Sequence, residues 1–237
     1  MSHYLIAKLE RYIELPAADK RVLETLAASN VKTLKPKQDL VRTGDKPIFV
    51  NLLLSGWAAR YIDLEDGRRQ IVGVILPGDI CDLRMFMLQK FDHSIGACTT
   101  ARFAQVPRQE LLDRMAEFPA IERALAWNSL VEEAMARAWI ANVGQRTALE
   151  RLAHLFVELF LRLQAVGLAH GNSCEFPLTQ EHLADAVGLT SVHVNRSLME
   201  LRAHGLIVLA NRTLTIPDPE PLMNVALFDP AYLHFER

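Results

Sequence analysis

Side chains that can hydrogen bond to DNA base edges or phosphates are concentrated in one short stretch, residues 191–196. Ser191, His193, Asn195 and Arg196 lie within six positions of one another. Asparagine pairs with adenine through two hydrogen bonds, and arginine pairs with guanine in the same way. Arg196 is the strongest candidate for reading sequence, because the bidentate contact of arginine to guanine is the commonest specific contact.

The same stretch has the apolar spacing of a helix that buries one face. Val194, Leu198 and Leu201 fall at positions i, i+4 and i+7, so we expect them to pack inward. Val192 and Met199 then lie outward with the polar side chains. The N-terminal end of such a helix is the part that enters a DNA major groove.

The flanking residues predict a pair of helices joined by a tight turn. Thr179 can cap a first helix over residues 180–187, and Gly188 is placed to stop it in a left-handed conformation. Thr190 can cap the second helix, and Gly205 can end it. This is the spacing of a helix-turn-helix.

A predicted β-hairpin follows the second helix. The runs LIVL and TLTI flank the polar turn Ala210-Asn211-Arg212, which favours the small wing of a winged helix. The residues predicted to contact DNA are Thr179, Gln180, Thr190, Ser191, Val192, His193, Asn195, Arg196 and Arg212.

These motifs resemble the DNA-binding domain of the Crp/Fnr superfamily of bacterial transcription regulators. The run GQRTALERLA at residues 144–153 is similar to the family's hinge and first C-terminal helix. The resemblance implies a homodimer that binds a palindromic site on double-stranded DNA and contacts RNA polymerase. Arg196 matches the family's recognition-helix arginine, whereas Ser191 and Val192 replace more polar or acidic residues. We therefore expect a different operator.

Composition limits the other possibilities. The chain has 237 residues, 50% of them hydrophobic, a net charge of −2 and a pI near 6.5. This balance argues against nonspecific binding of nucleic acid through bulk positive charge. The sequence shows no signal peptide and no apolar run of about 18 residues, so we expect a cytoplasmic protein without a membrane partner. Three scattered cysteines fit a reducing compartment.

Residues 31–106 have the pattern of an antiparallel β-roll. Short β-rich runs are separated by turns at Gly44, Gly56, Gly67 and Gly78, which recur every eleven or twelve residues. Two short helices are expected before it, within residues 2–29. In the family this roll is the cyclic-nucleotide-binding fold.

The predicted fold class is α+β. We expect N-terminal helices and a jelly-roll sensor domain over residues 1–118 and a long dimerisation helix over residues 119–143. A winged helix-turn-helix is expected over residues 144–216, with Gly144 as its hinge. Residues 217–237 form a C-terminal tail, either docked or loose.

The long helix carries an apolar stripe at steps of three and four, formed by Leu125, Asn128, Val131, Met135 and Ala138. Two interpretations are open for this stripe. It either packs as a core helix against the roll or forms the dimer seam, and the family resemblance favours the seam.

The effector pocket implied by the resemblance lacks its usual residues. The run PGDICDL at residues 77–83 lies where the phosphate cassette begins, but the Gly-Glu and Arg-Ser pairs are missing. Ala136-Arg137 stands where relatives present Thr-Ser to adenine. The candidate pocket residues are Asp79, Cys81, Asp82, Arg84, Lys90 and Arg137. We expect no cofactor and either an unknown effector or none.

Alternative functions remain open. Arg84 or Lys90 could replace the missing arginine in a cyclic-nucleotide-responsive regulator. A cupin-like metal enzyme needs clustered histidines, and the roll offers only His93, so we expect no enzyme. A protein-binding module is a third possibility. Cys81 or Cys98 could sense redox state, although buried structural thiols are favoured.

Overall fold

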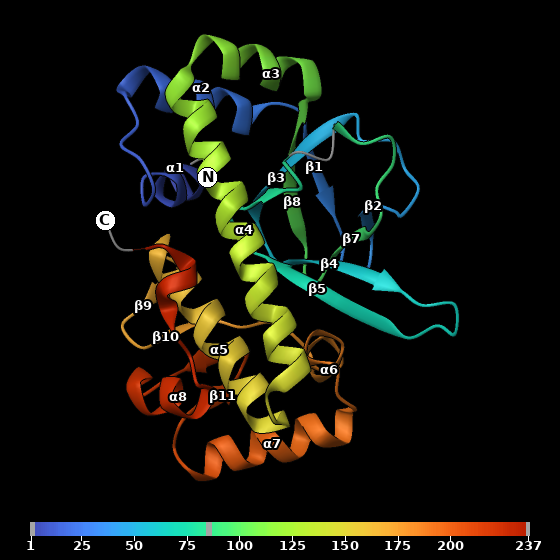
Figure 1. Ribbon diagram of the computed structural model, residues 1–237, viewed down its shortest axis with the longest axis vertical. Coiled ribbons are helices and arrows are strands. Elements are labelled where there is room, and N and C mark those ends of the chain that lie inside the picture. The colour runs from blue at the N-terminus through green and yellow to red at the C-terminus, as the bar shows by residue number, and fades with distance from the viewer. Residues whose placement is uncertain (1–2, 84–86, 236–237) are drawn as a thin grey trace. The chain divides into compact units, whose positions relative to one another are not determined.

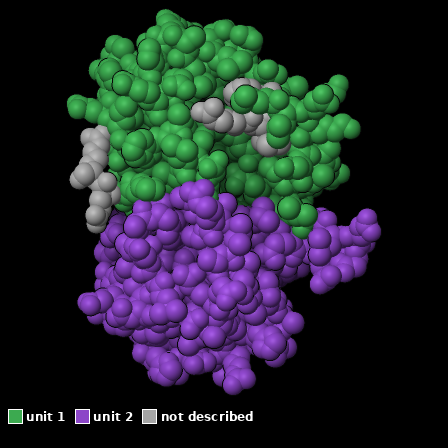
Figure 2. All heavy atoms as spheres, viewed as in Figure 1, with its two compact units in different colours: residues 1–62, 73–133, 234–237 green, residues 63–72, 134–233 purple. Residues whose placement is uncertain are grey.

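The computed structural model describes residues 3–83 and 87–235, and the chain divides into two compact units (Figures 1 and 2). Unit 1 comprises residues 1–62, 73–133 and 234–237, and unit 2 comprises residues 63–72 and 134–233. Among the described residues, no helix is long and apolar enough to cross a membrane.

The roll is built from short antiparallel strands. Among the described residues, one sheet has the strand order β1-β8-β3-β6 and another the order β2-β7-β4-β5. Their bounds are β1 Val31–Leu34, β2 Asp39–Val41, β3 Phe49–Ser55, β4 Ala58–Asp63, β5 Arg69–Ile75, β6 Ile80–Cys81, β7 Ser94–Ala97 and β8 Ala101–Pro107. The β-rich runs of the sequence match β3, β4, β5 and β8, whereas β1, β2, β6 and β7 are too short to stand out.

Helices cover the β1-β8-β3-β6 sheet of the roll (Figure 1). They are α1 (His3–Leu9), α2 (Ala17–Ala28), α3 (Arg108–Glu117) and the first part of α4 (Pro119–Gln145). Leu9 of α1 and Ile121 of α4 are fully buried in the cluster that these helices share with β3 and β8. Phe103 of β8 is fully buried in a second cluster, which includes residues of the other sheet.

Two predicted turn glycines are required by their surroundings. Gly56 has a φ of +82°, and an added Cβ would collide with the carbonyl oxygen of Thr100. Gly78 has a φ of +95°, and its Cβ would lie 2.8 Å from the backbone carbonyl of Tyr4 in α1. Helix α1 therefore packs directly against the turn that opens the cassette region.

Helix α4 extends beyond its expected end. It includes Gly144 in its last turn, so this glycine does not stop the helix. The chain turns at Arg146 and Thr147, and Thr147 caps α5 (Ala148–Ala165) with the reciprocal hydrogen bonds of a capping box shared with Glu150. The break between the two helices thus follows Gly144, because the Thr147 cap fixes where the next helix starts, and a hinge at Gly144 stays a prediction.

Unit 2 packs three further helices around α5. These are α6 (Gln180–Val187), α7 (Ser191–Ala203) and α8 (Pro219–Ala226). Its small sheet has the order β11-β12-β10-β9, with bounds β9 Ala169–His170, β10 Ser173–Glu175, β11 Val208–Ala210 and β12 Thr213–Thr215. The hairpin β11-β12 was predicted. Strands β9 and β10 are two and three residues long, and no clear pattern in the sequence predicts them.

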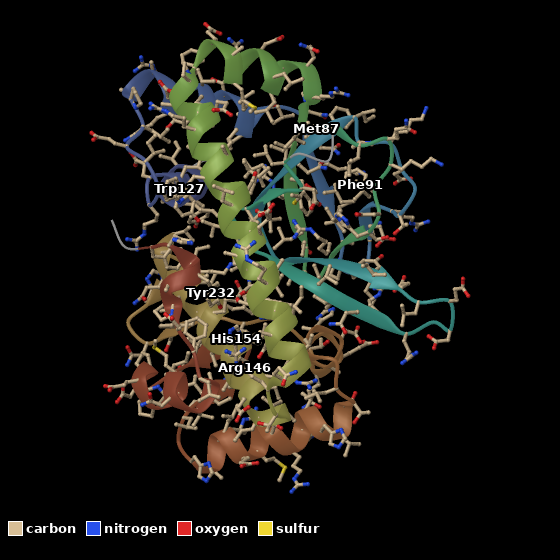
Figure 3. The ribbon with its side chains drawn as sticks, viewed as in Figure 1. Met87, Phe91, Trp127, Arg146, His154 and Tyr232 are labelled. Carbon is tan, nitrogen blue, oxygen red and sulfur yellow. The ribbon has the colours of Figure 1, made fainter. Side chains whose placement is uncertain are left out.

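The C-terminal segment is docked. Helix α8 packs on α5, and the Arg146 guanidinium donates hydrogen bonds to the carbonyl oxygens of Ala226 and Leu227 at 2.9 Å each. The short 3-10 helix η2 (Pro230–Leu233) brings Tyr232 beside α5, where its ring stacks on His154 (Figure 3). Of the two possibilities left open by the sequence, a loose tail is excluded for residues 218–233.

Candidate nucleic-acid interface

The predicted helix-turn-helix is formed by α6 and α7, and its local signals act as expected. The Thr179 hydroxyl accepts a hydrogen bond from the His182 amide at the start of α6. Gly188 ends α6 in the left-handed conformation, with a φ of +64°. The Thr190 hydroxyl then accepts from the His193 amide and starts α7.

Helix α7 has one buried face and one exposed face. The side chains of Val194, Leu198 and Leu201 are at most 1% exposed, as the spacing predicts. Their burial fixes the rotation of α7 about its axis. Ser191, His193, Asn195 and Arg196 therefore lie on the solvent side, in the first two turns.

The exposed face offers side chains that are ready to bind. Within the part of the chain that the structure describes, neither Asn195 nor Arg196 has an ion-pair or side-chain hydrogen-bond partner. Both also lie near the N-terminal end of α7, where backbone N–H groups favour negative charge such as a DNA phosphate. The arrangement can present a guanidinium and an amide to a major groove without first breaking an internal contact.

The wing is a tight two-residue hairpin. Asn211 and Arg212 have φ values of +50° and +59°, the pattern of a type I′ turn. Arg212 is exposed at its tip. Arg202, at the end of α7, donates to the Leu209 carbonyl oxygen at 3.0 Å and ties the helix to the wing.

All nine residues predicted to contact DNA are exposed. Thr179 and Thr190 already use their hydroxyls as helix caps, so their first role is to position the helices. Ser191, Val192, Asn195 and Arg196 have outward side chains on α7, and contact of any of the nine with DNA stays a prediction.

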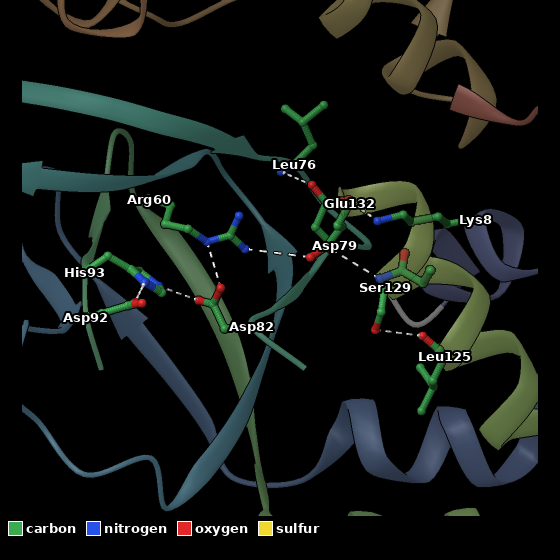
Figure 4. Close-up of polar contacts among 11 residues, drawn as sticks. Lys8, Arg60, Leu76, Asp79, Asp82, Asp92, His93, Leu125, Ser129 and Glu132 are labelled. Atoms are coloured by element: carbon green, nitrogen blue, oxygen red, sulfur yellow. Dashed lines mark hydrogen bonds and ion pairs between the residues drawn. The ribbon is translucent and has the colours of Figure 1, made fainter. Parts of the chain in front are cut away.

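The residues proposed for an effector pocket are partly neutralised by the chain's own cations (Figure 4). Lys8 of α1 donates to Asp79 Oδ1 at 2.7 Å, and Asp79 Oδ2 accepts from the Leu76 amide. Arg60 Nε of β4 lies 2.8 Å from Asp82 Oδ1, an ionic contact whose N–H is not aligned for a hydrogen bond.

Of the other candidate pocket residues, the structure describes Lys90, Arg137 and Cys81. Lys90 is exposed, and Arg137 is an exposed residue of α4. Arg84 lies outside the described residues. Cys81 is buried at 2% exposure, and burial raises the pKa of its thiol well above the usual value, which is the environment of an inert structural cysteine.

The acids and the histidine of this cluster shift one another's pKa. Burial would raise the pKa of Asp82, but the charge of Arg60 and a hydrogen bond with His93 lower it overall. Burial would lower the pKa of His93, but the Asp82 carboxylate, 2.9 Å from Nε2, and Asp92 raise it overall. Burial raises the pKa of Glu132, only partly offset by Lys8 and Arg60.

His93 is the one histidine that the roll sequence offers to a metal site. Its ring instead lies between Asp82 and Asp92, with one nitrogen directed at each. Among the described residues, no group of three His, Cys, Asp or Glu side chains is arranged to hold a metal ion.

Comparison with known proteins is consistent across both halves of the chain. Residues 31–118 match the model of the cyclic nucleotide-binding domain, and residues 150–225 match that of the Crp-like helix-turn-helix domain. The transcriptional activator protein FnrL of Cereibacter sphaeroides is 32% identical over 178 residues, which are 74% of this chain and 71% of the relative. The chain belongs to the Crp/Fnr family of transcription regulators.

Further relatives of this regulator extend the match. The nitrogen fixation regulation protein FixK of Bradyrhizobium diazoefficiens is 30% identical over 210 residues, covering 86% of this chain and 84% of the relative. The structure of FixK2 from Bradyrhizobium japonicum shares the fold, with a TM-score of 0.75, 23% identity, and coverage of 84% of this chain and 97% of that chain. The regulator thus has the helix-turn-helix and the roll that its sequence predicted.

Sequence reasoning missed three members of the charged cluster around Asp79 and Asp82: Lys8 of α1, Arg60 of β4 and Glu132 of α4. Lys8, Arg60 and Glu132 are far from Asp79 and Asp82 along the chain, so no local spacing connects them. One signal was available for Lys8, because it stands among the apolar residues of α1, three of which are buried.

Proposed function

We propose that this regulator binds a palindromic DNA site as a homodimer, with α7 of each protomer in a major groove, and that it needs no cyclic nucleotide to do so. The observation that carries the proposal is the outward face of α7, where Asn195 and Arg196 are exposed and unpaired among the described residues. In a two-fold dimer the two helices would enter successive major grooves about 34 Å apart.

The exposed side of α4 supports the homodimer. The stripe of Leu125, Asn128 and Val131 is buried in the chain's own core, so it is the core side of the helix and not a free seam. On the exposed side, Trp127 and Leu130 are 47% and 62% exposed; Trp127 is labelled in Figure 3.

The exposed side of α4 also has a regular spacing. Trp127, Leu130, Arg137, Ala141 and Gly144 are exposed, and together with Ala134, which is 7% exposed, they recur at steps of three and four residues. This is the heptad spacing with which two helices pair, and the small residues would let the backbones approach closely. We therefore place the dimer seam on this side, with Arg137 in the seam and not in an effector pocket.

Independence from cyclic nucleotide is supported by the charges in the roll. A bound cyclic phosphate needs an unshared cation, because burying an unpaired phosphate is costly. Lys8 and Arg60 are half-buried cations of this region, and each already contacts a carboxylate of the cassette. A nucleotide phosphate would have to compete with Asp79 and Asp82 for them.

We further infer that the bound dimer contacts RNA polymerase, as a transcription regulator in the cytoplasm. The support is the role of a relative, because FnrL is named a transcriptional activator. The low net charge of −2 implies a modest salt dependence of DNA binding, because few phosphates are neutralised.

The proposal is tested by selecting bound sequences from a random DNA pool with the purified protein, with and without cyclic AMP. We expect a two-fold symmetric motif in both conditions. Enrichment only with cyclic AMP would show that the roll does bind the nucleotide. No motif in either condition would favour a protein-binding module.

Arg196→Ala tests the reading face directly. We expect binding to weaken by about 1–3 kcal/mol and the preference at one base pair per half-site to relax. Arg108→Ala removes an exposed arginine from unit 1 and is the control for lost charge. Equal losses of DNA affinity in both variants would show that Arg196 does not contact a base specifically.

Leu130→Glu tests the seam. It introduces a charge on the exposed side of α4, so sedimentation should show a shift from dimer to monomer. Ile48→Glu is a matched control, because Ile48 has the same 62% exposure but precedes β3. An unchanged dimer in Leu130→Glu would place the interface elsewhere.

A further inference from the structure

Helix α7 exposes an apolar side chain in its first turn, the end of a recognition helix that enters a major groove. Val192 is the second residue of α7 and is 77% exposed. A β-branched residue loses side-chain freedom in a helix, and here it buries no surface that would offset this loss. Neither helix stability nor packing within the chain explains a valine at this position.

The neighbours of Val192 define what it would contact. Asn195 and Arg196 follow it by three and four positions, so the three side chains form one continuous patch on the outward face. An amide and a guanidinium fit the polar edges of adenine and guanine in the major groove. The apolar group on base edges in that groove is the C5-methyl of thymine.

We propose that Val192 determines specificity by packing its methyl groups on a thymine methyl in each half-site. The inference rests on the proposed function, because it requires α7 to lie in the major groove. Residues four apart on a helix are about 6 Å apart along its axis, roughly the rise of two base pairs. The thymine therefore lies within about two base pairs of the guanine contacted by Arg196.

Val192 also excludes an alternative specificity. A carboxylate at this position could accept a hydrogen bond from cytosine N4, and valine cannot. Val192 would therefore leave the amino group of cytosine without a partner on the protein, which costs binding free energy. The side chain thus favours thymine through contact and disfavours cytosine through desolvation.

The test uses the operator obtained by selection and replaces each thymine in turn with deoxyuridine, which removes only the methyl group. Binding is measured by fluorescence anisotropy at one fixed salt concentration. For the wild-type protein we expect about a fourfold loss of affinity at one thymine per half-site, the value for one buried methyl-sized group. Replacing that thymine in both half-sites should multiply the two losses.

Val192→Ala supplies the second arm of a double-mutant cycle. It should bind the thymine operator more weakly than the wild type and should no longer distinguish thymine from deoxyuridine at that position. Because Val192 is exposed, this variant should fold normally. Met199→Ala is the matched control: Met199 is 62% exposed on the same helix but seven positions further from its reading end, so this variant should keep the distinction.

The outcomes separate the two proposals. Wild-type binding that is indifferent to deoxyuridine at every position overturns the inference, and so does a Val192→Ala variant that keeps the distinction. In both cases the selected motif still supports the proposed function. Failure to select any motif overturns the proposed function itself.

Discussion

The two units bury charge in different ways. In unit 2 a single carboxylate, Glu158, is fully buried and accepts hydrogen bonds from Trp139 Nε1 at 3.0 Å and from the Tyr232 hydroxyl at 2.8 Å, with Arg162 nearby. In unit 1, among the described residues, three carboxylates share two permanent cations and one histidine: Asp79, Asp82 and Glu132 with Lys8, Arg60 and His93.

This difference between the two clusters predicts which unit changes its charge, and with it its stability, near neutral pH. Glu158 accepts hydrogen bonds from donors that do not titrate near neutrality. Its cluster can therefore hold α4, α5 and η2 together at any pH near neutral. The roll has more acids than permanent cations, so the charge of its cluster depends on His93 and Glu132. Buried networks of this kind are stable only when each member is satisfied.

The largest expected effect follows from removing the carboxylate of unit 2. Glu158→Ala leaves the indole of Trp139, the hydroxyl of Tyr232 and the charge of Arg162 without their shared partner. We expect unit 2 to lose about 3–5 kcal/mol of unfolding free energy, as when one member of a buried pair is removed. Chemical denaturation measures this loss, and Glu175→Ala, at an exposed position of β10, is the control. A loss below about 1 kcal/mol would contradict the comparison.

A smaller loss of unfolding free energy is expected when one hydrogen-bond donor of Glu158 is removed. Tyr232→Phe keeps the ring that stacks on His154 but deletes the hydrogen bond to Glu158. Hydrogen bonds to charged groups contribute about 1.5–3 kcal/mol. Hydrogen exchange should then speed up in η2 and α8, and unchanged exchange there would show that Glu158 does not fasten the C-terminal segment.

The comparison also predicts that acid weakens unit 2. Burial, with a contribution from the charge of Arg146, lowers the pKa of His154 to about 3. The unfolded chain binds this proton below pH 6.5 and the folded unit does not, so stability is full above pH 6.5 and falls as the pH drops. Between pH 7 and pH 5 the loss is about 2 kcal/mol. His154→Gln should remove this dependence, whereas His170→Gln, at an exposed position, should keep it.

The smallest expected effect is a pH dependence of the roll, opposite in direction to that of unit 2. The folded pKa of His93 is raised, so its stabilisation is full below pH 6.5 and is lost as the pH rises through the raised value. Hydrogen exchange of roll peptides, corrected for intrinsic rates, should therefore speed up between pH 6 and pH 8. His93→Gln should flatten this response and His3→Gln should not. A roll that becomes more stable over this interval would refute the assigned charge state.

The success of sequence reasoning varied with the distance between interacting residues. Thr179, Gly188 and Thr190 start or end a helix through hydrogen bonds to residues at most four positions away. Helix α6 accordingly has the predicted bounds. The inward face of α7 followed from spacing alone. By contrast, Lys8 meets Asp79 across 71 positions and Tyr232 meets Glu158 across 74. No periodicity reports contacts of that range.

The stripe on α4 shows a different limit. Periodicity identified an apolar side through Leu125 and Val131, but α4 has two sides that can be covered by protein. Burial assigned this stripe to the chain's own core and left Trp127 and Leu130 exposed. A pattern of apolar residues indicates that a surface is covered, and it does not say by what.

The helix-turn-helix, the wing, the roll and the family could be predicted from the sequence, because capping, turn conformation and amphipathic spacing are set by near neighbours. The pairing of the cassette acids with Lys8 and Arg60, the docking of the C-terminal segment and the exposed side of α4 could be assigned only from the folded chain. The physical reason is that charge pairing and burial depend on which distant residues share a low-dielectric interior, and that is fixed only when the chain is folded.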